Sequence, residues 1–361
     1  MKYTILKSHK VPAYLQLYRQ LRDDIIQQIY LYGTKLPSKR LLADELGIST
    51  VTVEHAYALL CDEGYVEARE RCGYIVLFRE SDGFSASGAY PTEPSKEPAV
   101  HSHPDFPLSV IRKTMRKVLA DYGELLLEKS PNCGIWELRE AISRYLARNR
   151  GMHIDVEQII IGSGSEYLYR LIVDLLGRHL IYAIESPSYK KIEQVYSASE
   201  ITYKSLPLSD SGINSKALEE TEADVLHTTP YRSYPSGVTA SASKRHEYIR
   251  WSKQNRRYII EDDFESEFSV LTKPTETLFS LSDSDNIIYL NTFSKTISPS
   301  LRIGYMVIPK HLVPVFDKKL GFYSCTVPTY MQYVLADLIR TGDFERHINR
   351  VRRTKRKELS L

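Results

Sequence analysis

The sequence predicts a multidomain protein in which a small α unit precedes a larger α/β unit. Three helical patterns and two short strands occupy residues 11–78. Residues 79–104 are rich in Gly, Ser and Pro and lack hydrophobic periodicity, which is typical of a flexible linker. In residues 105–361, continuous apolar runs alternate with amphipathic stretches. This pattern predicts an α/β/α unit whose mainly parallel sheet is covered on both faces.

The composition is that of an ordinary globular chain. Its 361 residues suffice for two domains, and 42% of them are hydrophobic and 26% charged. The net charge of +3 permits contact with nucleic acid without indicating it, because nucleic-acid-binding surfaces are usually more basic and more clustered.

The cysteines and the N-terminus predict a cytoplasmic location. The four cysteines are scattered and form neither a CxxC pair nor a Cys/His pattern with zinc spacing, which favours a reduced intracellular chain. The N-terminal segment lacks the apolar stretch of a signal peptide. No run in the sequence approaches the roughly 18 apolar residues that span a membrane.

The first two helices are predicted from periodicity and capping residues. Pro12 suits the first turn of a helix whose apolar positions recur at helical spacing. These positions are Tyr14, Leu17, Leu21, Ile25 and Ile29. Ser38 is the expected N-cap of a second helix, which runs through Leu46 and ends at Gly47.

A third helix and a hairpin complete the unit. Ser49 is the expected N-cap of the third helix, and Gly64 ends it. Its predicted inner face consists of Val53, Ala56, Tyr57 and Leu60. Residues 65–78, "YVEARERCGYIVLF", indicate two short strands joined by a charged turn. This order of elements is that of a winged helix-turn-helix, whose third helix can enter the major groove of double-stranded DNA while the wing lies along the phosphates. A structural winged helix that binds protein remains an alternative.

Residues 35–76, "KLPSKRLLADELGISTVTVEHAYALLCDEGYVEARERCGYIV", resemble the DNA-binding domain of GntR-type transcription regulators. The resemblance implies DNA contacts from Arg40, Ser49, Thr50, Thr52, Arg69 and Arg71. The family usually carries an arginine at the position of Thr50. Residues 1–79 hold 11 Lys/Arg against 9 Asp/Glu, so their positive charge is weak.

The α/β unit contains six apolar runs that predict buried strands: 158–162, 179–185, 223–228, 256–262, 286–291 and 302–308. Amphipathic stretches such as 167–177 and 243–254 predict the intervening helices. In sheets of this kind, ligands bind beyond the carboxyl ends of the strands.

Polar residues gather at those strand ends. Residues 162–165, "GSGS", join a strand to a helix, where exposed amides and the helix dipole favour a phosphate, although many such turns bind nothing. Tyr189 and Asp262 follow two further strands. The stretch 289–305 then supplies Thr292, Ser294, Lys295 and Arg302.

These residue types together predict a site for pyridoxal 5'-phosphate. A lysine amine forms a Schiff base with the aldehyde, and a carboxylate stabilises the protonated pyridine nitrogen. Taken singly, Asp262 could be a strand-end cap and Tyr189 a core residue. Their occurrence in this order at successive strand ends favours the cofactor site.

The segments "SEYLYRLIVDLLG", "TPYRSYPSG", "RRYIIEDDFESEF" and "NTFSKTISPSLRIGYMVIP" resemble fold-type I aminotransferases. More closely, they are similar to the aminotransferase-like domain of the MocR subfamily of GntR regulators. The resemblance implies that Lys295 forms the Schiff base, Asp262 pairs with the pyridine nitrogen and Tyr189 stacks on the ring. It implies that the phosphate is held by Ser163, Gly164, Ser165, Thr292 and Arg302.

The chain departs from this family pattern in three places. Phe264 replaces a tyrosine that commonly hydrogen-bonds the cofactor's phenolic oxygen. Tyr231, Arg232 and Ser233 stand where a Ser-His-Gln run is usual, and the sequence alone gives Arg232 no role. Residues 344–361 form a basic helical stretch, predicted to be a solvated face rather than a nucleic-acid contact, beyond which family members continue into a small domain. The aminotransferase-like domain is therefore expected to be truncated at its C-terminus, either naturally or as a fragment.

The leading prediction is a homodimeric transcription regulator that binds DNA and senses pyridoxal phosphate, or an amine or amino acid that reacts with it, through Lys295. It is not predicted to be an enzyme. Two alternatives remain: an active aminotransferase with a fused DNA-binding module, and a regulator that has lost the cofactor.

Overall fold

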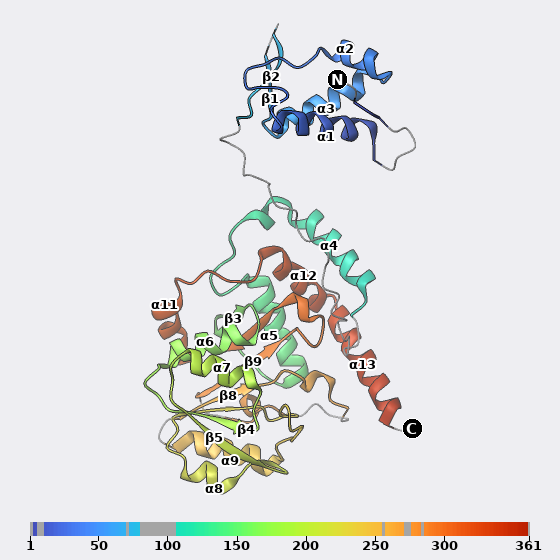
Figure 1. Cartoon of the computed structure of the whole chain (residues 1–361). Helices are drawn as coiled ribbons and strands as arrows, with labels where there is room; N and C mark the ends of the chain where they lie inside the picture. Colours follow the sequence, from blue (N-terminus) through green and yellow to red (C-terminus); the bar gives the residue numbers. More distant parts are fainter. Residues whose placement is uncertain are drawn as a thin grey trace. The chain divides into compact units, whose positions relative to one another are not determined.

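The computed structural model describes residues 3–5, 11–69, 72–79, 106–254, 257–270, 276–282 and 285–359. The chain divides into two compact units, Met1–Ala99 and Val100–Leu361 (Figure 1). All but the first residue of the predicted linker lies outside the described residues, and so does Arg71.

The first unit is a winged helix-turn-helix, as the sequence predicted. It consists of α1 (Ala13–Ile26), α2 (Lys39–Leu46), α3 (Thr50–Asp62), β1 (Val66–Arg69) and β2 (Gly73–Val76). The two strands pair antiparallel. The prediction was wrong for Ile29, which lies beyond the end of α1 and is 45% exposed. The helix ends before it because Gln28 adopts a left-handed backbone conformation, with φ of 61°.

The predicted caps of this unit are confirmed, and so is its core except for Tyr14 and Ile29, since Tyr14 is half-buried and lies outside the core. The Ser38 hydroxyl accepts the amide proton of Leu41 at 3.2 Å, and Gly47 ends α2 with φ of 61°. Ser49 caps α3 by accepting the amide proton of Thr52 at 3.1 Å. Apolar side chains of α1 and α3 form the centre of the core: Leu17, Leu21, Ile25, Val53, Ala56, Tyr57 and Leu60. Val66 and Val76 of the hairpin join this core, and burial of these side chains stabilises the unit.

The second unit contains one eight-stranded sheet in the order β3-β10-β9-β8-β7-β4-β5-β6. The strands are β3 (Ile159–Gly162), β4 (Tyr182–Ser186), β5 (Tyr203–Ser209), β6 (Gly212–Ile213), β7 (Val225–Thr228), β8 (Tyr258–Asp262), β9 (Ile287–Thr292) and β10 (Gly304–Val307). The five strands from β9 to β5 pair parallel, whereas β10 is antiparallel to both of its neighbours.

All six predicted strands are present, but β5 and β6 were missed. β5 carries Pro207, which is unfavourable in a strand interior, and Leu206 is its one buried residue. β6 has two residues and no pattern to recognise. Both lie at the far edge of the sheet from β3.

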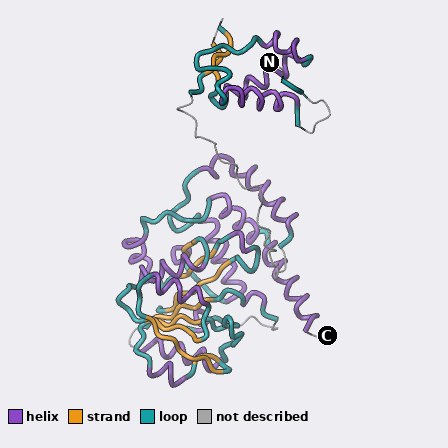
Figure 2. The backbone as a smooth tube through the Cα atoms, viewed as in Figure 1, coloured by secondary structure: helices purple, strands orange, loops and turns teal. Residues whose placement is uncertain are grey.

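Helices cover both faces of this sheet (Figure 2). The α-helices are α4 (Leu108–Tyr122), α5 (Trp136–Arg150), α6 (Ser165–Leu176), α7 (Lys190–Ala198), α8 (Ser215–Glu220), α9 (Ala242–Lys253), α10 (Leu278–Leu281), α11 (Val313–Leu320), α12 (Thr329–Arg340) and α13 (Asp343–Leu359). Short 3₁₀ helices are η2 (Gly123–Leu127), η3 (Val156–Gln158), η5 (Ser266–Phe268), η6 (Pro299–Leu301) and η7 (Lys310–Leu312). None of the helices in the described parts of the chain combines the length and apolar character that a membrane span requires.

The two-sided covering explains the continuous apolar runs. Ile159 and Ile161 of β3 belong to a core formed with α5 and α12, whereas the intervening Ile160 belongs to a core formed with α6 and α7. Successive strand residues point to opposite faces, so both faces must be apolar when both are covered.

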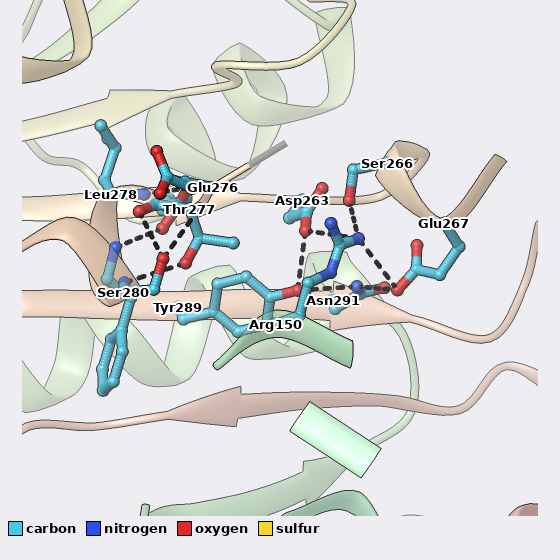
Figure 3. A network of polar contacts seen from close by, with 12 residues as sticks. Arg150, Asp263, Ser266, Glu267, Glu276, Thr277, Leu278, Ser280, Tyr289 and Asn291 are labelled. Carbon is cyan, nitrogen blue, oxygen red and sulfur yellow. Dashed lines mark hydrogen bonds and ion pairs between the residues drawn. The ribbon is translucent and has the colours of Figure 1, made fainter. Parts of the chain in front are cut away.

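A buried charged network holds the segment that follows β8 (Figure 3). Arg150, at the end of α5, lies 3.4 Å from Asp263 and 3.8 Å from Glu267, and it donates a hydrogen bond to Ser266. Two side chains of β9 donate to these carboxylates at 2.7 Å: Tyr289 and Asn291. Burial raises the pKa of Glu267 to about 7 against the opposing effect of Arg150. The network fixes residues 263–267 beside the end of β8.

Candidate functional site

A cavity of about 240 Å³ lies at the carboxyl ends of the central strands. Six of the predicted cofactor residues line it: Ser165, Tyr189, Asp262, Thr292, Lys295 and Arg302. Ser163 and Gly164 are not among its described lining residues. The Ser163 amide donates to the Thr326 hydroxyl at 3.0 Å, and Gly164 lies next to the guanidinium of Arg302.

Lys295 is held in the loop between β9 and β10 by two buried neighbours. Phe293 and Ile297 are 3% and 5% exposed, so they anchor the loop on either side of the lysine. The Phe293 amide donates to the Ile303 carbonyl at 2.9 Å, and the Ile297 amide donates to the Phe293 carbonyl at 2.9 Å. The turn between two buried strands therefore presents the lysine at the carboxyl end of β9.

The Lys295 amine contacts two residues of the segment after β8. Its Nζ lies 3.4 Å from Glu265 Oε2 and 4.3 Å from the centre of the Phe264 ring. An ammonium over an aromatic face is favourable, so Phe264 contributes to the site although it lacks a hydroxyl. Glu265 was not predicted as a site residue, although it lies three residues after Asp262 in the acidic run "EDDFESE".

Asp262 is a buried carboxylate at the end of β8. One oxygen, Oδ2, accepts a hydrogen bond from the Tyr169 hydroxyl of α6 and lies 3.7 Å from His227 Nε2. The other oxygen, Oδ1, is buried and has no hydrogen-bond partner among the described residues. A buried oxygen without a hydrogen-bond partner is energetically costly. Because Asp262 lines the cavity, we expect a bound ligand to donate a hydrogen bond to Oδ1, as a protonated ring nitrogen would.

The opposite end of the cavity fits a phosphate. Gly164, with φ of 95°, precedes the first turn of α6, whose N-terminal dipole favours an anion. A Cβ at Gly164 would lie 3.0 Å from an Arg302 nitrogen, so a side chain there would crowd the guanidinium. The unpartnered oxygen of Asp262 and the end of the cavity lined by Ser165 and Arg302 together fit pyridoxal phosphate.

Glu166 is a second residue that the sequence analysis did not identify. Its carboxylate forms ion pairs with Arg302 at 2.7 Å and with Lys191 at 2.5 Å. Burial alone would raise the pKa of Glu166, but hydrogen bonds from Lys191, its own amide and Arg302 lower it to about 2. This carboxylate therefore competes with any phosphate for Arg302. Its place directly after Ser165, in the first turn of α6, was the available sequence signal.

The predicted DNA-contacting residues lie around α2, α3 and the hairpin. Arg40 and Thr50 are exposed near the starts of α2 and α3. The Ser49 hydroxyl hydrogen-bonds the Thr52 hydroxyl at 2.8 Å, so these two side chains are engaged in the cap. Arg69 is exposed on β1 and pairs with Glu67 at 2.7 Å.

The two units match two protein families. Residues 13–76 match the bacterial regulatory proteins of the gntR family, and residues 98–359 match aminotransferase class I and II. A kynurenine aminotransferase structure from Pyrococcus horikoshii, in complex with PMP, is similar with a TM-score of 0.64 and 27% identity. That match covers 70% of this chain and 65% of the aminotransferase chain. The second unit is thus an aminotransferase class I and II domain.

Regulators match over nearly the whole chain. The HTH-type transcriptional regulator YdeL of Bacillus subtilis is 32% identical over 97% of this chain and 78% of its own length. The probable rhizopine catabolism regulatory protein MocR of Rhizobium meliloti is 27% identical over 95% of this chain and 75% of its own length. The pyridoxine biosynthesis regulator PdxR of Corynebacterium glutamicum is 28% identical over 96% of this chain and 77% of its own length. The chain belongs to the MocR-type regulators of the gntR family, which bind DNA and carry an aminotransferase-like domain.

Proposed function

We propose that this regulator senses pyridoxal phosphate, or an amine or amino acid that reacts with it, at Lys295. One observation carries the proposal: Asp262, at the end of β8, lines the same cavity as Lys295 and Arg302, which stand seven residues apart in the connection between β9 and β10. A lysine, a buried carboxylate and an arginine beside a helix N-terminus match the aldehyde, ring nitrogen and phosphate of this cofactor.

Each side chain of the cavity has a distinct task in the proposed mechanism. Pyridoxal phosphate supplies an aldehyde that condenses with a primary amine. Lys295 would present that amine, and Asp262 Oδ1 would accept a hydrogen bond from the protonated ring nitrogen. Arg302 and the N-terminal end of α6 would hold the phosphate, and Tyr189 would cover the ring. Tyr169 and His227 both lie next to Oδ2, the other oxygen of Asp262, and thereby orient the carboxylate.

Arg302 and Glu166 are expected to change phosphate recognition in opposite directions. Arg302→Gln should weaken the binding of pyridoxal phosphate at least tenfold, the effect of losing one charge-assisted hydrogen bond. Glu166→Gln should tighten it severalfold, because the competing carboxylate is removed from Arg302. Absorbance titrations with pyridoxal phosphate and with unphosphorylated pyridoxal measure both effects. Equal changes for the two ligands would show that these residues do not recognise the phosphate.

The DNA-binding function is tested through Arg40. Arg40→Ala is expected to weaken binding to DNA from the gene's own upstream region about tenfold, and to reduce the salt slope of log K by roughly 0.9. Arg178→Ala, on the second unit, is the control and should leave both quantities unchanged. The measurement is an electrophoretic shift at several salt concentrations, with a scrambled fragment for comparison. Absence of sequence-specific binding, with or without pyridoxal phosphate, would overturn the proposed function.

Sensing requires that the ligand favour one state of the regulator over another. We propose a homodimer in which paired second units present two DNA-binding heads to two half-sites. Large apolar side chains are exposed on the second unit, notably Leu127 at 88% and Phe322 at 70%. Their exposure supports a protein–protein interface on this unit, as the proposed homodimer requires. Regulation rather than amino-group transfer is the proposed role, because the relatives matched over nearly the whole chain carry the names of regulators.

A further inference from the structure

We propose that Arg232 recognises the carboxylate of an amino acid that takes the place of Lys295 on the cofactor. The effector class is then an amino acid rather than a simple amine. The inference rests on the proposed function of Lys295 and adds a specificity-determining residue to that site.

Glu265 connects Arg232 to the reactive lysine. Its two oxygens face two cations: Oε2 lies 3.4 Å from Lys295 Nζ, and Oε1 lies 3.7 Å from Arg232 Nη1. The distance to Arg232 is longer than a charge-assisted hydrogen bond, and the Arg232 side chain is 52% exposed. The guanidinium therefore retains donors for a second carboxylate close to Lys295.

The charges around Glu265 leave a positive excess. Lys355 of α13 lies over the Phe268 ring at 4.9 Å and is a third cation near this carboxylate. Burial lowers the pKa of Lys355, and the charges of Arg232 and Lys295 lower it further while Glu265 opposes them. Three cations thus surround Glu265, and Glu358 is a second carboxylate that acts on Lys355. The described charges keep an excess of one cation, so an incoming anion gains from the local field.

Arg232 stands on a loop that is held in place. Its φ of 53° is unusual for a residue other than glycine, and its amide donates to the Thr239 hydroxyl at 3.1 Å. The neighbouring Ser233 donates to the fully buried Glu185, and its amide donates to the Val238 carbonyl at 2.8 Å. A loop fixed in this way lowers the entropy cost of presenting the guanidinium to a ligand.

The placement of Glu265 between Lys295 and Arg232 suits the exchange of Lys295 for an effector on the cofactor. The effector's amine nitrogen takes over the bond to the cofactor's aldehyde carbon, and Lys295 Nζ leaves as a primary amine with the two protons that the effector nitrogen gave up. No electrons are transferred. The released Lys295 can pair fully with Glu265, which frees Arg232 for the effector carboxylate.

The experiment compares L-alanine and β-alanine with ethylamine, the amine that both would leave on losing their carboxylate. The protein is loaded with pyridoxal phosphate and titrated with each probe, and the fraction of Lys295 trapped by borohydride is measured by mass spectrometry. Arg232→Gln is expected to raise the half-effect concentration of at least one amino acid tenfold or more, while that of ethylamine stays within about threefold. Comparing variants for each probe cancels the different basicities of the three amines.

Arg178→Gln is the matched control, because Arg178 is similarly exposed, at 48%, and pairs with one carboxylate, Asp174. It should leave all three titrations unchanged, and Arg232→Lys should restore part of the amino-acid affinity. Equal shifts for ethylamine and both amino acids in Arg232→Gln, or no shift for any probe, would overturn the inference while the trapped Lys295 still supports the proposed function. No trapped Lys295 in the wild-type protein would instead overturn the proposed function, and the inference with it.

Discussion

Replacing Lys295 with alanine is expected to abolish the visible absorbance band that appears when pyridoxal phosphate is added to the purified protein. The lysine amine is the group that condenses with the aldehyde, and its loop is anchored by buried neighbours that the substitution leaves in place. The variant should also bind the upstream DNA fragment with an affinity that no longer responds to pyridoxal phosphate. Absorbance spectra and electrophoretic shifts with and without the cofactor measure these two effects.

Lys191→Ala is the matched control for this prediction. Lys191 lines the same cavity, but its amine is paired with Glu166 at 2.5 Å. The control should keep the absorbance band, because the side chain at position 295 is unchanged. If Lys191→Ala lost the band and Lys295→Ala kept it, Lys191 rather than Lys295 would be the lysine that condenses with pyridoxal phosphate. That result would contradict the account.

Substitution of Arg150 by methionine is expected to cost about 3–5 kcal/mol in the free energy of unfolding of the second unit, because it strands buried carboxylates without their cation. The side chains of Arg150, Asp263 and Glu267 are 2%, 5% and 3% exposed, so water cannot replace the arginine. Both tryptophans, Trp136 and Trp251, lie in the second unit, so their fluorescence during denaturant titration reports this unit alone.

Arg144→Met on the same helix is the control, since this side chain is 68% exposed and pairs with Glu140 at the surface. It should change the free energy of unfolding by about 1 kcal/mol or less. Adding Glu267→Gln to Arg150→Met should recover part of the lost stability, because one stranded charge is removed. Similar effects for Arg150→Met and Arg144→Met would show that the buried network does not stabilise the fold.

The sequence predicted the elements whose signals are local. Ser38, Gly47 and Ser49 ended or began helices as expected, because capping depends on a few adjacent residues. The six strands under two layers of helices were recognisable because both of their faces are buried, which makes most of their residues apolar. Ile29 was misassigned because apolar periodicity continued past a backbone turn at Gln28 that periodicity does not report.

The candidate site was predictable where strand order alone brings residues together. Asp262 and Thr292 end the neighbouring parallel strands β8 and β9, and Lys295 comes shortly after β9, so their meeting at one edge of the sheet follows from topology. The ion-pair partners of Glu166 and Glu265 were not predictable, because they depend on which cation a flexible carboxylate reaches in space. The contact of Arg232 with Glu265 joins two loops that lie far apart in the sequence.

The most direct measurement is the mass of the peptide that contains Lys295 after the protein has been incubated with pyridoxal phosphate and reduced with borohydride. The account predicts a pyridoxyl-phosphate adduct on Lys295 in near-stoichiometric yield, and none on Lys191. An unmodified Lys295 peptide under conditions in which the protein is folded and binds its upstream DNA would contradict it.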